Sequence, residues 1–309
     1  MKSLEYIEIN NATQCVSINS DDSEKPILLY LHGGPGDAAI PLVDKYNKNL
    51  RDSFSVVVLE QRGSGKSYYP FTEKDNLKIG TFVDDIYALS LLLLKRFGHE
   101  KLYLLGHSWG SVLGINFIKR YPELVHAYIG CGQVVNMKKS SQAAYEFVLQ
   151  RNKEKQNNKV LSKLKSIDYT YQQESWLEEL LFVTKQVVKQ KGSLYGKSNY
   201  NQFLFDFLMS PDYSTKDLLN RQKGALQSIK YLWRELMDVN FEDTTSFEVP
   251  VVFVEGRSDF HVSSALVYEY YQAITSPKEF HWFENSCHFP QWSEPQKFCE
   301  VMKSIVSTQ

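Results

Sequence analysis

The chain has 309 residues, of which 43% are hydrophobic and 14% aromatic, so it can bury a sizeable core and is not disordered as a whole. Its 35 basic and 36 acidic side chains leave a formal charge of −1, which argues against electrostatic binding of nucleic acid or of an anionic membrane. The four cysteines form no CxxC pair. Free thiols in a reducing compartment are therefore expected, rather than a disulfide framework or a thiolate metal site.

The N-terminal segment does not resemble a secretory signal, because Glu5 and Glu8 interrupt the place where an unbroken apolar stretch is needed. The longest apolar run, 89–94, is bracketed by charged residues too closely to span a bilayer. We expect a soluble, cytoplasmic protein without a membrane partner. The sequence leaves its oligomeric state open.

The first predicted elements are strands. Loose alternation over 6–18 predicts a half-buried pair of strands. Short apolar runs without polar alternation then recur along the chain, and each stops at a glycine-containing segment. Strands of this kind are buried on both faces, which is typical of a parallel sheet covered by helices. These runs are 27–31, 54–59, 102–105 and 249–254.

Helical patterns separate these strands. Residues 81–97 place an apolar stripe on one face and end at Gly98, and 111–120 read as a buried helix. Strands that alternate with helices predict an α/β fold with an open, doubly wound, mostly parallel sheet. In such sheets the functional loops lie at the carboxyl ends of the strands, which is where the glycine-rich breaks fall.

The segment 134–246 differs in composition from the rest of the chain. It is rich in Lys, Gln and Asn, has helical periodicity and lacks β-branched runs. We predict that it is a helical cap inserted between two strands, with 1–133 and 247–309 forming the core. The charged run 150–165 could be mistaken for a nucleic-acid patch, but a solvated helix face is favoured.

The sequence Gly106-His107-Ser108-Trp109-Gly110 fits the G-x-S-x-G pattern between a short buried strand and a helix. A serine in this context occupies a strained turn that exposes its hydroxyl at the helix N-terminus, where the partial positive charge favours a developing anion. The pentapeptide alone also occurs by chance. Its position between strand and helix predicts that Ser108 is a nucleophile rather than a structural turn residue.

A serine nucleophile needs a histidine base and an acid that orients it. In this architecture the chain order is serine, acid, histidine. Asp259 follows the last of the apolar strands, and a predicted helix (263–274) and strand (279–283) separate it from His288. We therefore predict Asp259 and His288 as the partners of Ser108. Glu284 is interpreted as a loop carboxylate rather than the acid.

The segment His32-Gly33-Gly34-Pro35-Gly36 ends the strand 27–31. The loop after this strand supplies one backbone donor for the oxyanion of acyl transfer, and the residue after the serine supplies the other. We predict the N–H groups of Gly34 and Trp109 as these donors. This chemistry requires no metal and no organic cofactor.

Three motifs in order resemble the proline iminopeptidase (prolyl aminopeptidase) branch of the α/β-hydrolases. They are HGGPG at 32–36, EQRGSGKS at 60–67 and GHSWGS at 106–111, and the segments around Asp259 and His288 look like the acid and histidine loops of that family. The resemblance covers 1–133 and 247–309. It implies a serine peptidase that removes an N-terminal residue, often proline, from short peptides.

The resemblance also implies carboxylates, mostly from the cap, that bind the free amine of the substrate, because a buried ammonium needs a paired charge. Glu235, beside aromatic residues, is the preferred candidate and Glu178 the second; Glu174 and Glu179 are further candidates. The chain departs from the family in having Glu60 in place of an aspartate, where we expect a structural pair with Arg62.

Three other functions are weighed against an aminopeptidase. A carboxylesterase, lactonase or amidase acting on a small hydrophobic acyl compound would use the same triad. It is favoured by Phe260, because some relatives carry an amine-binding glutamate at that position. A non-catalytic ligand receptor is disfavoured by the complete set of triad residues. Epoxide hydrolases and dehalogenases use a carboxylate nucleophile, whereas residue 108 is a serine.

Overall fold

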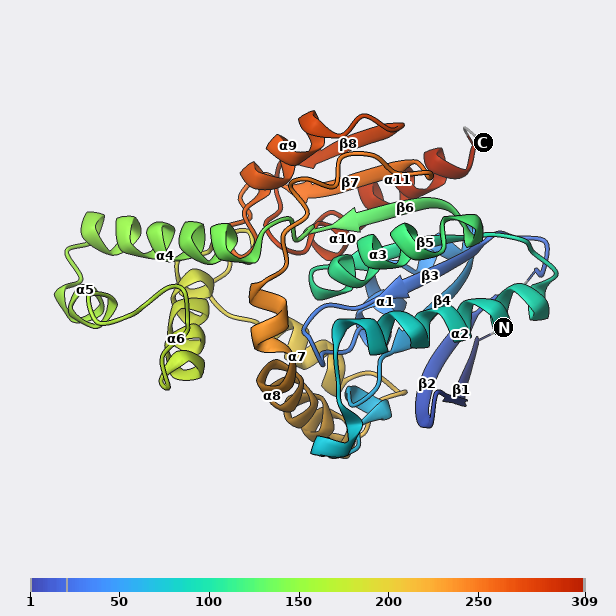
Figure 1. Ribbon diagram of the computed structural model, residues 1–309, viewed down its shortest axis with the longest axis horizontal. Coiled ribbons are helices and arrows are strands. Elements are labelled where there is room, and N and C mark those ends of the chain that lie inside the picture. Colours follow the sequence, from blue (N-terminus) through green and yellow to red (C-terminus); the bar gives the residue numbers. More distant parts are fainter. Residues whose placement is uncertain (1, 21, 308–309) are drawn as a thin grey trace.

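The computed structural model describes residues 2–20 and 22–307, which form an eight-stranded sheet with helices on both faces (Figure 1). The strand order is β1-β2-β4-β3-β5-β6-β7-β8. The first two strands run antiparallel to their neighbours and the rest of the sheet is parallel. This confirms the predicted α/β fold. The strands are β1 (Lys2–Ile9), β2 (Ala12–Asn19), β3 (Ile27–Leu31), β4 (Ser55–Glu60), β5 (Leu102–His107), β6 (Val125–Cys131), β7 (Val251–Gly256) and β8 (Lys278–Phe283).

Helices cover the sheet on two sides. Side chains of α2, α3 and α9 belong to the core on one face, and those of α1 and α11 to the core on the other. None of the helices in the described part of the chain combines the length and apolar character needed to cross a bilayer. The helices are α1 (Ile40–Tyr46), α2 (Ile79–Phe97), α3 (Trp109–Arg120), α4 (Met137–Glu154), α5 (Asn158–Leu164), α6 (Trp176–Lys189), α7 (Asn201–Leu208), α8 (Thr215–Met237), α9 (Ser264–Ala273), α10 (Pro290–Ser293) and α11 (Pro295–Ser307), with short 3-10 turns at Lys48–Asp52, Gly65–Ser67, Glu73–Asp75 and Pro122–Leu124.

One strand of the sheet was not predicted. Strand β6 follows the 3-10 turn that begins at Pro122, and it pairs with β5 on one side and β7 on the other. Its apolar residues are interrupted by the exposed His126 near the start, so the run lacks the continuous apolar character of the other central strands. With β6 in place, the carboxyl ends of β5, β6 and β7 lie side by side.

The long helical segment lies between β6 and β7 and contains α4 to α8. In Figure 1, α4, α5 and α6 project beyond the sheet, while α8 lies below it. Helix α8 packs its backbone directly on two loops of the sheet. A Cβ on Gly224 would lie 2.4 Å from the Gly63 carbonyl oxygen, and a Cβ on Gly36 would lie 2.4 Å from the Gly224 carbonyl oxygen. Glycine is required at this contact because any side chain would push the helix away.

The predicted pair between Glu60 and Arg62 is wrong. Arg62 instead binds Asp85 of α2 in a bidentate pair, with both nitrogen–oxygen distances at 2.6 Å. Glu60 accepts hydrogen bonds from the Tyr213 hydroxyl and from the Lys66 backbone N–H. Strand β4 ends at Glu60, and the turn that follows it directs Arg62 toward Asp85 of α2, while Glu60 stays beneath the loop.

Replacing Asp85 with alanine is expected to lower the free energy of unfolding by about 3–5 kcal/mol, because the Arg62 guanidinium would be left buried without its counter-charge. The side chains of Arg62 and Asp85 are 6% and 2% exposed. Asp84→Ala is the matched control, since Asp84 pairs with Arg120 at the surface and such pairs contribute at most about 1 kcal/mol. Urea unfolding measures both. Equal losses for the two variants would contradict this account of Asp85.

Candidate active site

Ser108 lies at the sharp turn between β5 and α3. Its backbone has a φ of 53° and a ψ of −118°, a conformation that L-residues adopt only when their surroundings hold them in it. The Ser108 N–H donates to the Cys131 carbonyl at the end of β6, and the Ser111 N–H donates to the Ser108 carbonyl. Glycines on either side allow the close approach: a Cβ at Gly106 would lie 2.4 Å from the Gly110 carbonyl oxygen, and a Cβ at Gly110 would lie 2.2 Å from the Leu31 carbonyl oxygen.

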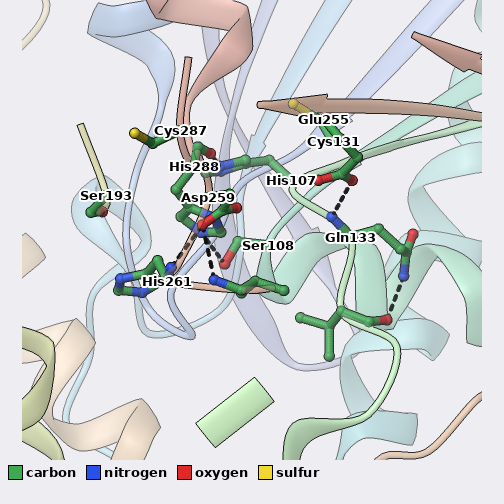
Figure 2. A network of polar contacts seen from close by, with 12 residues as sticks. His107, Ser108, Cys131, Gln133, Ser193, Glu255, Asp259, His261, Cys287 and His288 are labelled. Carbon is green, nitrogen blue, oxygen red and sulfur yellow. Dashed lines mark hydrogen bonds and ion pairs between the residues drawn. The ribbon is translucent and has the colours of Figure 1, made fainter. Parts of the chain in front are cut away.

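The structure brings together the three residues predicted as the triad. Figure 2 shows His288 between the hydroxyl of Ser108 and the carboxyl of Asp259. The His288 Nε2 lies 2.9 Å from the Ser108 Oγ, and its Nδ1 lies 2.8 Å from the Asp259 Oδ2. The other Asp259 oxygen accepts the backbone N–H groups of His261 and Val262, at 2.8 and 3.0 Å. The imidazole is thereby fixed with Nε2 toward the hydroxyl.

The residues predicted as oxyanion donors lie beside this hydroxyl. Gly34, Ser108 and Trp109 line the same cavity. Within residues 2–20 and 22–307, neither the Gly34 nor the Trp109 backbone N–H donates a hydrogen bond. A Cβ at Gly33 would lie 3.2 Å from the Ser108 Cβ, so the loop after β3 rests directly against the serine. Two unpaired donors at this position suit an oxygen that becomes negatively charged.

Gln61 connects the loop after β4 to both of these segments. Its side chain accepts the indole N–H of Trp109 at 2.8 Å and donates to the His32 carbonyl at 3.1 Å. The Gln61 backbone N–H donates to the His32 ring at 3.1 Å. The motif at 60–67, which the sequence suggested only through a resemblance, thus holds the glycine-rich loop and the start of α3 in place.

A cavity of about 520 Å³ opens above Ser108. Helices α4, α6 and α8 form much of its wall with apolar side chains. These include Met137, Ala144, Leu180, Val187, Ile229 and Trp233. The helical segment between β6 and β7 therefore covers the serine and determines most of the shape of the space in front of it.

A family model described as the alpha/beta hydrolase fold matches residues 26–295. The chain belongs to this family. A relative over nearly the full length is the "Probable aminopeptidase YbaC" of Bacillus subtilis, with 32% identity over 301 residues, which are 97% of this chain and 94% of the relative.

A further relative carries the name of one branch of the α/β-hydrolases, and a solved structure shares the fold. A "Proline iminopeptidase" of Heyndrickxia coagulans is 25% identical over 91% of this chain and 90% of its own length. The crystal structure of a proline iminopeptidase-related protein from Thermus thermophilus superposes with a TM-score of 0.62 at 20% identity, covering 99% of this chain and 98% of that one. The chain is therefore an α/β-hydrolase of the proline iminopeptidase type.

In this α/β-hydrolase the two glutamates predicted to bind a substrate amine do not line the cavity. Glu235 accepts the backbone N–H of Ile79 at 2.8 Å and so caps the N-terminus of α2. Glu178 lies at the surface, 78% exposed, opposite Lys163. Residues two positions apart on a helix point about 200° apart, so Trp233 faces the cavity while Glu235 faces the N-terminus of α2. The predicted role of both glutamates is therefore corrected.

The sequence prediction missed three residues that the α/β-hydrolase places at the site. His261 lines the cavity, and its ring lies 4.6 Å from that of His288. Asp37 and Arg221 also line the cavity and pair with each other. The closeness of His261 to Asp259 in sequence is the signal that could have placed it at the site. Nothing in the sequence indicated Arg221.

Burial governs the protonation of the site. It raises the pKa of the Asp259 carboxyl to about 7 and lowers the pKa of the His288 imidazole to about 3. The two groups share a hydrogen bond and titrate as a unit, which takes up one extra proton on the acid side of the pH range. Burial also lowers the pKa of His107 and of His261 to about 3, so both flanking imidazoles are neutral.

Proposed function

We propose that this α/β-hydrolase is a serine hydrolase that cleaves its substrate through an acyl-enzyme, and that it acts as an aminopeptidase on short peptides. The observation that carries the proposal is the unbroken hydrogen-bonded chain from Ser108 through His288 to Asp259, at distances of 2.9 and 2.8 Å. The helical segment 134–246 acts as a cap and lets small substrates reach these three residues.

In the proposed reaction Ser108 attacks the carbonyl carbon while His288 accepts the hydroxyl proton. The backbone N–H groups of Gly34 and Trp109 stabilise the oxyanion. His288 then returns the proton to the leaving amine, which leaves Ser108 acylated. Water attacks the acyl-enzyme with His288 again as the base, and Asp259 holds the imidazole in the required tautomer throughout.

Two findings favour an aminopeptidase. Relatives named aminopeptidase and proline iminopeptidase match 91% or more of this chain. The cavity also contains a carboxylate, that of Asp37, which a substrate ammonium would need as a partner. The Asp37 Oδ1 accepts the N–H of Ala38 and the Arg221 side chain, whereas its Oδ2 accepts no hydrogen bond from the residues that the structure describes.

The test compares three substrates: a proline anilide, the same anilide with an N-acetyl group, and a nitrophenyl ester of a simple fatty acid. An aminopeptidase requires the free amine, so N-acetylation is expected to lower kcat/KM by about 100-fold, because the acetylated nitrogen loses its charge and its partner. Equal rates on the free and the acetylated anilide would contradict the peptidase assignment.

A carboxylesterase, lactonase or amidase is the second candidate, and the cavity itself favours it. Its wall is predominantly apolar, and neither Glu235 nor Glu178 reaches it. A hydrophobic acyl group would fill this space without a charged partner. Hydrolysis of the nitrophenyl ester with no activity on either anilide is the result that would select this candidate.

The pH dependence follows from the shared proton of Asp259 and His288. His288 can accept the Ser108 proton only after the pair has lost its extra proton, so kcat/KM is expected to rise about tenfold per unit below pH 7 and to level off above it. Activity is lost on the acid side of the profile because burial raises the pKa of the Asp259 carboxyl. A nitrophenyl ester is the substrate of choice, since it carries no titrating amine. A profile that stays flat from pH 5 to 8 would contradict this assignment.

A further inference from the structure

Two charged side chains face the cavity in front of Ser108. Among the described residues that line it, Asp37 is the only carboxylic acid and Arg221 is the only arginine or lysine, and the imidazole of His261 is neutral. Asp37 belongs to the loop after β3, three residues beyond Gly34, and Arg221 belongs to α8. The reaction proposed above uses the Arg221 guanidinium at no step, although it shares the cavity with Ser108.

The Arg221 side chain is held rigidly. Its Nε donates to the Asp37 Oδ1, and its guanidinium lies 4.3 Å from the centroid of the Phe207 ring. One turn further along α8, Gly224 packs its backbone against the loops at Gly36 and Gly63. A guanidinium fixed by an ion pair, a ring and a close-packed helix has lost its rotamer freedom before any ligand arrives, so little further entropy is lost on binding.

The pair with Asp37 uses only one side of the guanidinium. The Nη1 and Nη2 groups donate no hydrogen bond to the residues that the structure describes, so the two-pronged end of Arg221 remains open. Arginine presents at this end two parallel N–H donors that match the two oxygens of a carboxylate. A neutral substrate would leave these donors unpaired in a predominantly apolar cavity, which is unfavourable.

We propose that Arg221 is a specificity-determining residue that binds a carboxylate of the substrate close to the bond that is cleaved. In its peptide form this inference rests on the proposed function. Two parts of a short peptide could supply the carboxylate: the C-terminus of the leaving residue in a dipeptide, or the side chain of an acidic residue in the acyl position. The shared chemistry is a carboxylate that receives two N–H groups from one guanidinium.

The experiment measures ratios of kcat/KM between matched substrates. The first pair is prolyl-glycine and prolyl-glycine amide, which differ in the C-terminal carboxylate. The second pair is a glutamyl and a glutaminyl anilide, which differ in the acyl side chain. We expect the wild type to prefer the carboxylate in one of these pairs by about 10- to 100-fold, as hydrogen bonds between charged groups would give. The substrate pair in which the carboxylate is preferred identifies the part of the substrate that supplies this group.

Three variants test whether Arg221 is responsible for the preference for the carboxylate substrate. In Arg221→Met the ratio is expected to fall to about 1. In Arg221→Lys, which keeps the charge but lacks the paired donors, the ratio is expected to be intermediate, and this variant preserves the test should the methionine variant fail to fold. Lys223→Met is the matched control, because Lys223 is an exposed cation on the same helix and does not line the cavity; its ratio is expected to match the wild type.

A separate pair of substrates distinguishes failure of this inference from failure of the peptidase assignment. Nitrophenyl hemisuccinate and nitrophenyl butyrate are esters of similar length that differ in a terminal carboxylate. Should the protein cleave esters but no peptides, a preference for the hemisuccinate that disappears in Arg221→Met would still support the carboxylate site. A wild-type ratio near 1 in all three pairs, or a ratio unchanged in both Arg221 variants, would overturn it.

Discussion

Replacing Ser108 with alanine is expected to lower kcat by on the order of 10⁴-fold or more, on esters and anilides alike, because no acyl-enzyme can form without the hydroxyl. The free energy of unfolding is expected to change little. Among the residues that the structure describes, the hydroxyl makes a hydrogen bond to His288 only, and the alanine keeps the backbone bonds that hold the turn. Steady-state kinetics and urea unfolding of the two proteins measure the two effects.

Covalent labelling provides the control for this variant. A fluorophosphonate is expected to label the wild type once, at Ser108, and to leave Ser108→Ala unlabelled. Ser111→Ala is a useful comparison. Ser111 is a buried serine in the first turn of α3, and its hydroxyl donates to the Ser108 carbonyl. Labelling of Ser108→Ala, or activity retained in that variant, would exclude Ser108 as the nucleophile.

The positions of Ser108, Asp259 and His288 in the fold could be predicted, because each depends on local chain features. Ser108 follows a short buried strand and precedes a helix, and Asp259 and His288 each follow a strand. The carboxyl ends of parallel strands meet at one edge of the sheet, so residues far apart in sequence are expected to converge there. The three side chains converge in the structure, although the sequence pattern does not reveal β6, the strand that lies between β5 and β7.

The contacts made by the helical segment could not be predicted in the same way. Which residues of α8 face the cavity depends on how the helix is rotated against the core, and that rotation is fixed by the contact of Gly224 with two distant loops. The sequence favours Glu235 because an aromatic residue, Trp233, lies close to it, but on the helix Trp233 and Leu236 face the cavity and Glu235 faces α2. Arg221 was missed for the same reason.

Replacing Asp259 with asparagine is expected to lower kcat by about 10⁴-fold while the fold is retained. The carboxyl is buried, 2% exposed, and accepts N–H groups from His288, His261 and Val262. An asparagine can keep the two backbone bonds through its carbonyl oxygen. Its NH₂ group would then face Nδ1 of His288 and donate to it, so that the ring proton would move to Nε2 and the base would be blocked toward Ser108.

Glu284→Gln is the matched control for this variant. Glu284 is the other acidic side chain that the sequence offered for the role, and it pairs with Arg257 at the surface, where its side chain is 58% exposed. Its kcat is expected to stay within about twofold of the wild type, because a surface ion pair contributes at most about 1 kcal/mol. Equal losses of activity in Glu284→Gln and Asp259→Asn would contradict the assignment of Asp259 as the acid that orients His288. Full activity in Asp259→Asn would show that His288 needs no buried carboxyl to act as the base.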